Sequence, residues 1–255
     1  MPSGLARIVG ASLALAAAAS LLGSPLEKKA PKRRTPTATR TPSPTPTPVP
    51  PAPEEVLRTM ADVYAKCGTY RDEGVVRMTF HEKAGDRLDE RPFTTEFVRP
   101  DYFRFEYRDR FSQSGDYRRN LVWWDGKQAW TSFSFRPKPK KARSLDEALS
   151  DATGVSGGSA HRVPKLLLPD RVTGRTIVNL RDPKLEGMEP IAEKVCYRLT
   201  GLYAPEDPRI TVWIETDSHL VRRVSGASTF PEFSLDVVTD YAGSVDVDVP
   251  RKATP

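Results

Sequence analysis

The chain has 255 residues, of which 39 are basic and 33 acidic, and a net charge of +6. Seven of the basic residues and only one of the acidic residues lie at positions 1–53, so residues 54–255 carry equal numbers of both signs. A neutral domain with interspersed charges lacks the basic surface that a phosphate backbone requires, so we expect no nucleic-acid partner.

Residues 1–53 predict an export signal followed by a linker. Arg7 precedes an apolar run from Ile8 to Gly23, which is shorter than the ~20 residues that cross a bilayer as a helix. We expect a signal peptide over 1–24, with an uncleaved anchor as the alternative. Residues 25–53 are rich in Lys, Arg, Thr and Pro and predict a disordered, extended linker. The protein is therefore expected to be exported to the periplasm or cell envelope, where its N-terminus can tether it to a membrane.

Residues 54–250 are expected to form one domain, with a tail over 251–255. The domain begins with apolar residues at helical spacing after Glu54 and Glu55, which predict an amphipathic helix that ends near Gly68. Asp125-Gly126 is a two-residue hairpin signal that demands positive φ. Antiparallel strands are predicted over 74–80, 93–98, 102–109, 120–124 and 127–135.

A central segment interrupts the strands with two short helices. Ser144 is predicted to cap the first, with Glu147 as its reciprocal partner, and 162–168 forms the second. Further strands are predicted over 176–180, 192–202, 209–215, 220–226 and 233–241. Since the order shows no βαβ alternation, we expect an α+β fold: a large curved antiparallel sheet that forms a half-open β-barrel, capped by the N-terminal helix and the two central helices.

The aromatic residues are concentrated in the first half of the predicted sheet. Thirteen of the twenty-two lie between Phe93 and Phe135. Along 102–108 they alternate with charged residues, so Phe103, Phe105 and Tyr107 share one face of a strand. Such a face is either a core filled by helices or a cavity lined for an apolar ligand. Residues expected to line that cavity are Phe97, Phe103, Phe105, Trp124, Trp130 and Val212.

No catalytic or metal-binding motif is supported. Residues 154–158 match G-x-S-x-G, but the residues before them look helical and not like the strand that this motif requires, so a flexible glycine loop is the preferred interpretation. The three histidines lack ligand spacing. We therefore expect neither an enzyme nor a metal or other cofactor. Cys67 and Cys196 are interpreted either as a disulfide, as an exported protein permits, or as two separate buried thiols.

Three stretches together resemble the LolA/LolB-like superfamily of outer-membrane lipoprotein carriers and sorting proteins, whose relatives include regulators of the RseB type. They are 98–107 (VRPDYFRFEY), 124–130 (WDGKQAW) and 211–223 (TVWIETDSHLVRR). The resemblance implies an unclosed barrel capped by helices over an apolar cavity for acyl chains. It also implies that Arg99, in the Arg-Pro pair, holds the lid by hydrogen bonds. The long linker, the two cysteines and the charged insertion Arg136–Arg143 depart from the simple carriers and favour a tethered relative.

The expected function is non-enzymatic binding of a lipid or of a lipoprotein acyl chain in the bacterial cell envelope, by a monomer. The alternative is a sensor or scaffold domain that binds an envelope protein through its lid or a sheet edge. A hydrolase that uses Ser156 is a third class.

Overall fold

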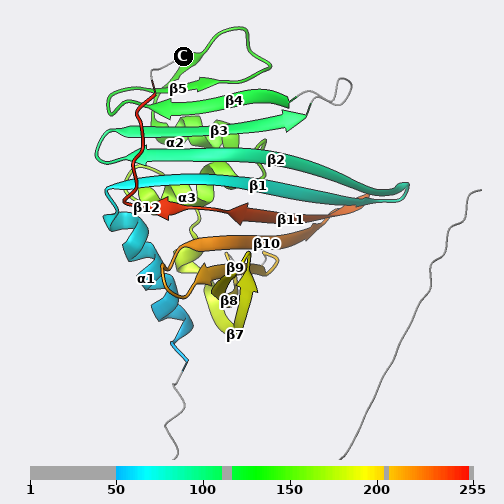
Figure 1. The fold of residues 1–255 in the computed structure, drawn as a ribbon. Helices are drawn as coiled ribbons and strands as arrows, with labels where there is room; N and C mark the ends of the chain where they lie inside the picture. The colour runs from blue at the N-terminus through cyan, green and yellow to red at the C-terminus, as the bar shows by residue number, and fades with distance from the viewer. Residues whose placement is uncertain (1–49, 111–116, 204–206, 253–255) are drawn as a thin grey trace, which may run out of the picture. The chain divides into compact units, whose positions relative to one another are not determined.

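A single antiparallel sheet organises the part of the chain that the computed structural model describes, which is residues 50–110, 117–203 and 207–252 (Figure 1). The predicted signal peptide and almost all of the predicted linker lie outside these ranges. The helices are α1 (Pro53–Lys66), α2 (Leu145–Thr153) and α3 (Ser159–Leu167), with a 3-10 turn, η1 (Ile177–Asn179). The strands are β1 (Thr69–Glu82), β2 (Gly85–Val98), β3 (Tyr102–Arg110), β4 (Tyr117–Trp124), β5 (Ala129–Ser132), β6 (Lys140–Ala142), β7 (Arg181–Ile191), β8 (Lys194–Leu202), β9 (Ile210–Glu215), β10 (Val221–Thr229), β11 (Phe233–Tyr241) and β12 (Ser244–Val245).

The strand order is β6-β5-β4-β3-β2-β1-β11-β10-β9-β8-β7, with β12 paired to β1. Strands β1 to β6 form one half of the sheet and β7 to β11 the other, and the halves meet where β1 pairs with β11. Strands β6 and β7 are free edges, so the sheet does not close into a barrel. The predicted α+β fold with an open, half-barrel sheet is confirmed.

The helices form where the sequence predicts them. Pro53 occupies the first position of α1 and Glu54 and Glu55 its first turn, which are the residues that suit a helix N-terminus. For α2, the Ser144 hydroxyl accepts a hydrogen bond from the Glu147 N–H at 3.1 Å. The predicted reciprocal bond from Glu147 back to Ser144 is wrong, because the Glu147 carboxylate accepts from the Arg143 backbone N–H instead.

The second half of the sheet differs from the prediction in two places. The strand predicted over 176–180 is wrong, because the Thr176 hydroxyl caps a 3-10 turn there. Strand β7 was not predicted, because it is an edge strand with mainly exposed residues, two register shifts and a glycine, Gly187, at φ +139°. Exposed edge strands lack the alternating apolar pattern on which strand prediction depends.

The three helices lie on one face of the sheet. The loop between α2 and α3 approaches β1 so closely that a Cβ on Gly157 would lie 2.7 Å from Val76. Helix α2 also lies beside β4, β5 and β6, while α1 contacts α3 and β7. The helices therefore cover the same face from both halves of the sheet.

Candidate functional site

Five of the six residues predicted to line an apolar cavity share the helix-covered face. Phe103 lies opposite Phe97 on β2 and Trp124 on β4, so these side chains are cross-strand neighbours. Phe105 and, in the other half of the sheet, Val212 point the same way and belong to the same hydrophobic cluster. We call this cluster, with the aromatic residues beside it, the aromatic face: Tyr70, Phe93, Phe97, Phe103, Phe105, Tyr107, Trp124, Val212 and Tyr241.

Trp130 is not part of the aromatic face. On β5 its neighbour Ala129 joins the buried cluster, so Trp130 points to the opposite side of the sheet. There it stacks on Trp123, with ring centroids 6.0 Å apart and an interplanar angle of 7°. Its prediction as a lining residue therefore does not fit this geometry. Counting the alternation outward from Trp124 across the hairpin would have shown the difference.

The aromatic face is filled. The side chains of Phe97, Phe103, Phe105 and Val212 are 0% exposed and packed beneath the helices. None of these four residues lines any of the five main hollows in the described part of the chain, whereas Trp124 borders a hollow of about 190 Å³ beside Tyr102 and Lys252. The expected open cavity beneath the helices is therefore wrong for this conformation: the face is a closed core.

Arg99 joins the helices above the aromatic face. It follows β2, and its Nε donates to the Cys67 carbonyl at 3.0 Å, just beyond the end of α1. Its Nη2 donates to the Leu167 carbonyl, at the end of α3, at 3.0 Å, and to the Tyr64 carbonyl at 3.4 Å. The last carbonyls of a helix have no partner within it, and the negative end of the helix dipole favours a cation. One guanidinium thus links the C-terminal ends of two helices to the sheet.

A buried polar cluster lies near the same end of the sheet. Asp72 is 1% exposed and accepts hydrogen bonds from the Tyr70 hydroxyl and from the Ala242 N–H, both at 2.9 Å. Burial raises the pKa of the Asp72 carboxyl to about 6, although both hydrogen bonds oppose that rise. Our sequence interpretation missed this residue. The signal was present, because Asp72 continues the inward-facing positions that Tyr70 and Val76 occupy on β1.

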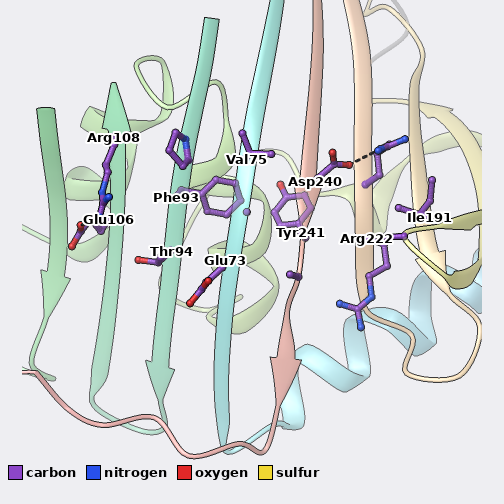
Figure 2. Close-up of a pocket in the computed structure, with 15 residues that line it drawn as sticks. Glu73, Val75, Phe93, Thr94, Glu106, Arg108, Ile191, Arg222, Asp240 and Tyr241 are labelled. Atoms are coloured by element: carbon purple, nitrogen blue, oxygen red, sulfur yellow. Dashed lines mark hydrogen bonds and ion pairs between the residues drawn. The ribbon is translucent and has the colours of Figure 1, made fainter. Parts of the chain in front are cut away.

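The largest of the main hollows lies on the opposite, outer face of the sheet and has a volume of about 650 Å³ (Figure 2). Its charged lining is balanced: Arg223 pairs with Asp240 at 2.5 Å, and Arg108 lies 3.7 Å from Glu106. Phe93 and Tyr241 reach this hollow beside Gly74, which has no side chain to separate them from it. The lining of this hollow thus combines paired ions with apolar surface from Phe93 and Tyr241.

The remaining reactive side chains have structural roles in this conformation. Ser156, of the G-x-S-x-G match, is 0% exposed. Its Oγ donates to the Thr153 carbonyl and accepts from the N–H of Ala160, a residue of α3, at 3.1 Å. Cys67 and Cys196 are free and buried, and they lie in separate clusters. The disulfide interpretation is therefore wrong here, and that of two separate thiols holds. Among the described residues, no group of His, Cys, Asp and Glu is arranged to hold a metal ion, and no helix is long and apolar enough to cross a bilayer.

Comparison with known proteins found similarity to solved structures. No family model and no curated protein sequence matches the chain. Solved structures that resemble it include LprF from Mycobacterium bovis (10% identity, 79% of this chain and 97% of that chain, TM-score 0.43) and the lipoprotein LppX of Mycobacterium tuberculosis (16%, 77% and 98%, 0.39). A LolA superfamily protein from Nitrosomonas europaea is also similar (10%, 77% and 94%, 0.28). Identities and TM-scores this low do not transfer a function, so the residues of this chain carry the functional argument.

Proposed function

We propose that this protein is a non-enzymatic, exported binder of an acyl chain, and that α2 and α3 act as a lid over the aromatic face. The observation that carries the proposal is the set of hydrogen bonds from Arg99 to the ends of α1 and α3. An arginine at a helix end also stabilises ordinary cores, but here a single side chain joins α3 to the end of α1 and to the sheet. Opening the lid breaks the bond to α3 together with the apolar packing beneath the lid.

The lid is made of elements that can leave the sheet as a unit. Helices α2 and α3 have nine residues each and are joined by a loop with Gly154, Gly157 and Gly158. Beyond the link at Arg99, Arg162 donates to the Thr239 hydroxyl at 2.9 Å, and Arg91 of β2 donates to the Val155 carbonyl in the loop between α2 and α3. These links are made by side chains of the sheet or the lid, whereas the sheet is held by continuous backbone ladders. When the lid opens, the sheet therefore keeps its shape.

An acyl chain is the ligand that this face suits best. Most side chains beneath the lid are aromatic or aliphatic and pack in one cluster with the apolar residues of the helices, although Thr239 and Asp72 are also buried on this side. A ligand that replaces the helices must supply equivalent apolar contact, at about 0.8 kcal/mol for each buried CH2 group. A long hydrocarbon chain does so, whereas a polar ligand would leave its own groups unpaired.

The test is displacement of a fluorescent fatty acid from the purified protein, together with lipid extraction and native mass spectrometry. We expect saturable uptake of one acyl ligand. Lack of uptake by a folded sample, with a stoichiometric protein recovered from envelope extracts instead, would favour the sensor or scaffold alternative. Any hydrolytic activity that disappears in a Ser156→Ala variant would contradict the non-enzymatic assignment.

A further inference from the structure

The segment Arg136–Arg143 is the strongest local concentration of charge in the described domain. It contains Arg136, Lys138, Lys140, Lys141 and Arg143, two prolines and no acidic residue. Because residues 54–255 are neutral as a whole, the rest of the domain has five more acidic than basic residues. This segment therefore carries a local excess of positive charge, on the connection that leads through β6 into α2.

The cations of this segment are mostly unpaired. Arg143 contacts Glu147 at 3.1 Å. Lys138, Lys140 and Lys141 are exposed and form no salt bridge with any acidic residue that the structure describes. Pro137 and Pro139 restrict the backbone between them, since a proline fixes φ. The segment thus presents its charge to solvent on a stiffened strand at a free edge of the sheet.

An aromatic ring is exposed immediately beside these cations. Phe135 is 63% exposed, and its ring stacks on that of Phe133, with centroids 5.4 Å apart. Phe133 is 2% exposed and belongs to the core. The Arg136 guanidinium lies over both rings, 5.4 Å from the Phe133 centroid and 5.2 Å from that of Phe135. Phe135 is therefore held outward by neighbours that are themselves anchored.

We propose that Phe135 and the five cations of 136–143, the basic edge, dock the domain onto a membrane surface that contains anionic lipid. Lipid phosphates attract the lysines and arginines, and Phe135 enters the boundary between headgroups and acyl chains. Charge complementarity favours this occupant, because the cations are concentrated at one exposed edge next to an apolar side chain. Binding along a nucleic-acid duplex depends on phosphate contacts and gains nothing from an exposed phenylalanine at the tip.

The basic edge borders the proposed lid. Helix α2 packs beside β5 and β6, and Glu147 in its first turn pairs with Arg143. Docking would thus bring the lid close to the membrane from which an acyl chain would come. The membrane contact itself does not depend on acyl binding, because none of its residues belongs to the aromatic face.

The test is co-sedimentation of the full chain with vesicles of phosphatidylcholine alone and of phosphatidylcholine with phosphatidylglycerol. The variant Lys138→Gln/Lys140→Gln/Lys141→Gln is expected to lose affinity for the anionic vesicles by about 100-fold, because each basic side chain near such a surface contributes about a fivefold gain. Phe135→Ser is expected to weaken binding about tenfold. Added salt should reduce the effect of the lysines.

The matched control is Lys66→Gln/Lys83→Gln/Lys184→Gln, which removes three exposed lysines elsewhere and lowers the net charge equally. The basic residues at 1–53 are present in every variant, so their contribution cancels. Equal binding by the two triple variants would overturn the proposal, as would lysine-dependent binding to duplex DNA with none to vesicles. Fatty-acid displacement without vesicles should be unchanged in both triple variants, so failure of acyl binding is read separately from failure of docking.

Discussion

Replacement of Arg99 by leucine should weaken the fold and at the same time strengthen acyl binding. Leucine keeps apolar bulk near Phe97 and removes the guanidinium that bonds to the Tyr64, Cys67 and Leu167 carbonyls. Only the Leu167 bond connects Arg99 to α3, so only that bond is lost when the lid opens in the native protein. A hydrogen bond to a charged group contributes about 1.5 kcal/mol at the low end of its range.

The open state should therefore become about tenfold more populated relative to the closed state. A ligand that binds only the open state has an apparent Kd equal to its intrinsic Kd divided by the open fraction. The apparent affinity for a fluorescent fatty acid should then rise about tenfold. The free energy of unfolding should fall by roughly 4.5 kcal/mol, since all three bonds are lost on unfolding. Arg99→Lys, which can reach one carbonyl, should give intermediate values for both measurements.

The control is an arginine of similar chemistry away from the lid. Arg222 donates to the Gly243 carbonyl at 2.8 Å and pairs with Glu215. Arg222→Leu should lower the melting temperature without raising acyl affinity. If Arg99→Leu binds the probe no better than the parent protein while its melting temperature falls, Arg99 is an ordinary structural residue and the lid proposal is wrong. If Arg222→Leu gains affinity to the same extent, the gain reflects general loosening.

Three further outcomes are expected. Burial raises the pKa of Asp72 to about 6, above its ordinary value of 3.8, so the folded state holds that proton more tightly than the unfolded chain does. As the pH rises from about 4 to 6, the contribution of Asp72 to the free energy of unfolding should fall by roughly 3 kcal/mol. Melts compared across that range should lack this contribution in Asp72→Asn. Phe103→Ala should cost about 3–5 kcal/mol in denaturant titrations and Trp130→Ala clearly less, since Trp130 is half-buried on the outer face; equal losses would contradict the assignment of faces. The intact mass should be the same with and without reductant, and Cys67 and Cys196 should react with an alkylating reagent only after unfolding; a two-proton mass difference would show that they pair.

The first half of the sheet could be predicted because apolar and charged side chains alternate along strands such as β3. Along β3, Phe103 and Phe105 alternate with charged residues, and this period of two gives both the strand and its inward face. The turn at Asp125-Gly126 was readable for a similar reason: Gly126 has φ +88°, and the Asp125 carboxylate accepts from the Lys127 and Gln128 N–H groups. The position of the turn was therefore predicted from local chemistry, but its two-residue length was wrong, because Trp124 pairs with Ala129 and the loop spans residues 125–128.

The edges of the sheet could not be predicted in the same way. Strand β7 is exposed along most of its length, so no apolar period marks it, and β6 is a three-residue strand within a run of basic residues. Both exist because a neighbouring strand offers a backbone ladder, which is a long-range property. Trp130 was predicted to point inward because it is aromatic. The pairing of Ala129 with Trp124 instead places Trp130 on the outer face.

The state of the aromatic face was also beyond the sequence. A strand with Phe103 and Phe105 inward has the same pattern whether helices or a ligand cover it. Whether the face is a core or a cavity depends on whether α2 and α3 lie on it. Their position depends on contacts between residues far apart in the chain, such as those of Arg99 with Leu167 and of Arg162 with Thr239. The prediction of an open cavity thus assumed that a ligand, and not α2 and α3, covers the aromatic face.

A closed face limits what can bind there. In the closed state the lid buries its own apolar residues, such as Leu149, Val163 and Leu167, against the sheet, so opening exposes apolar area on both surfaces. The free energy needed to expose this apolar area, at about 25 cal/mol for each Å², greatly exceeds the free energy needed to break the hydrogen bond between Arg99 and Leu167. A small apolar molecule would cover only part of the exposed area and would leave the closed state favoured. A long acyl chain lies between the two surfaces and covers both, so the same packing that keeps the empty protein closed selects for chain length.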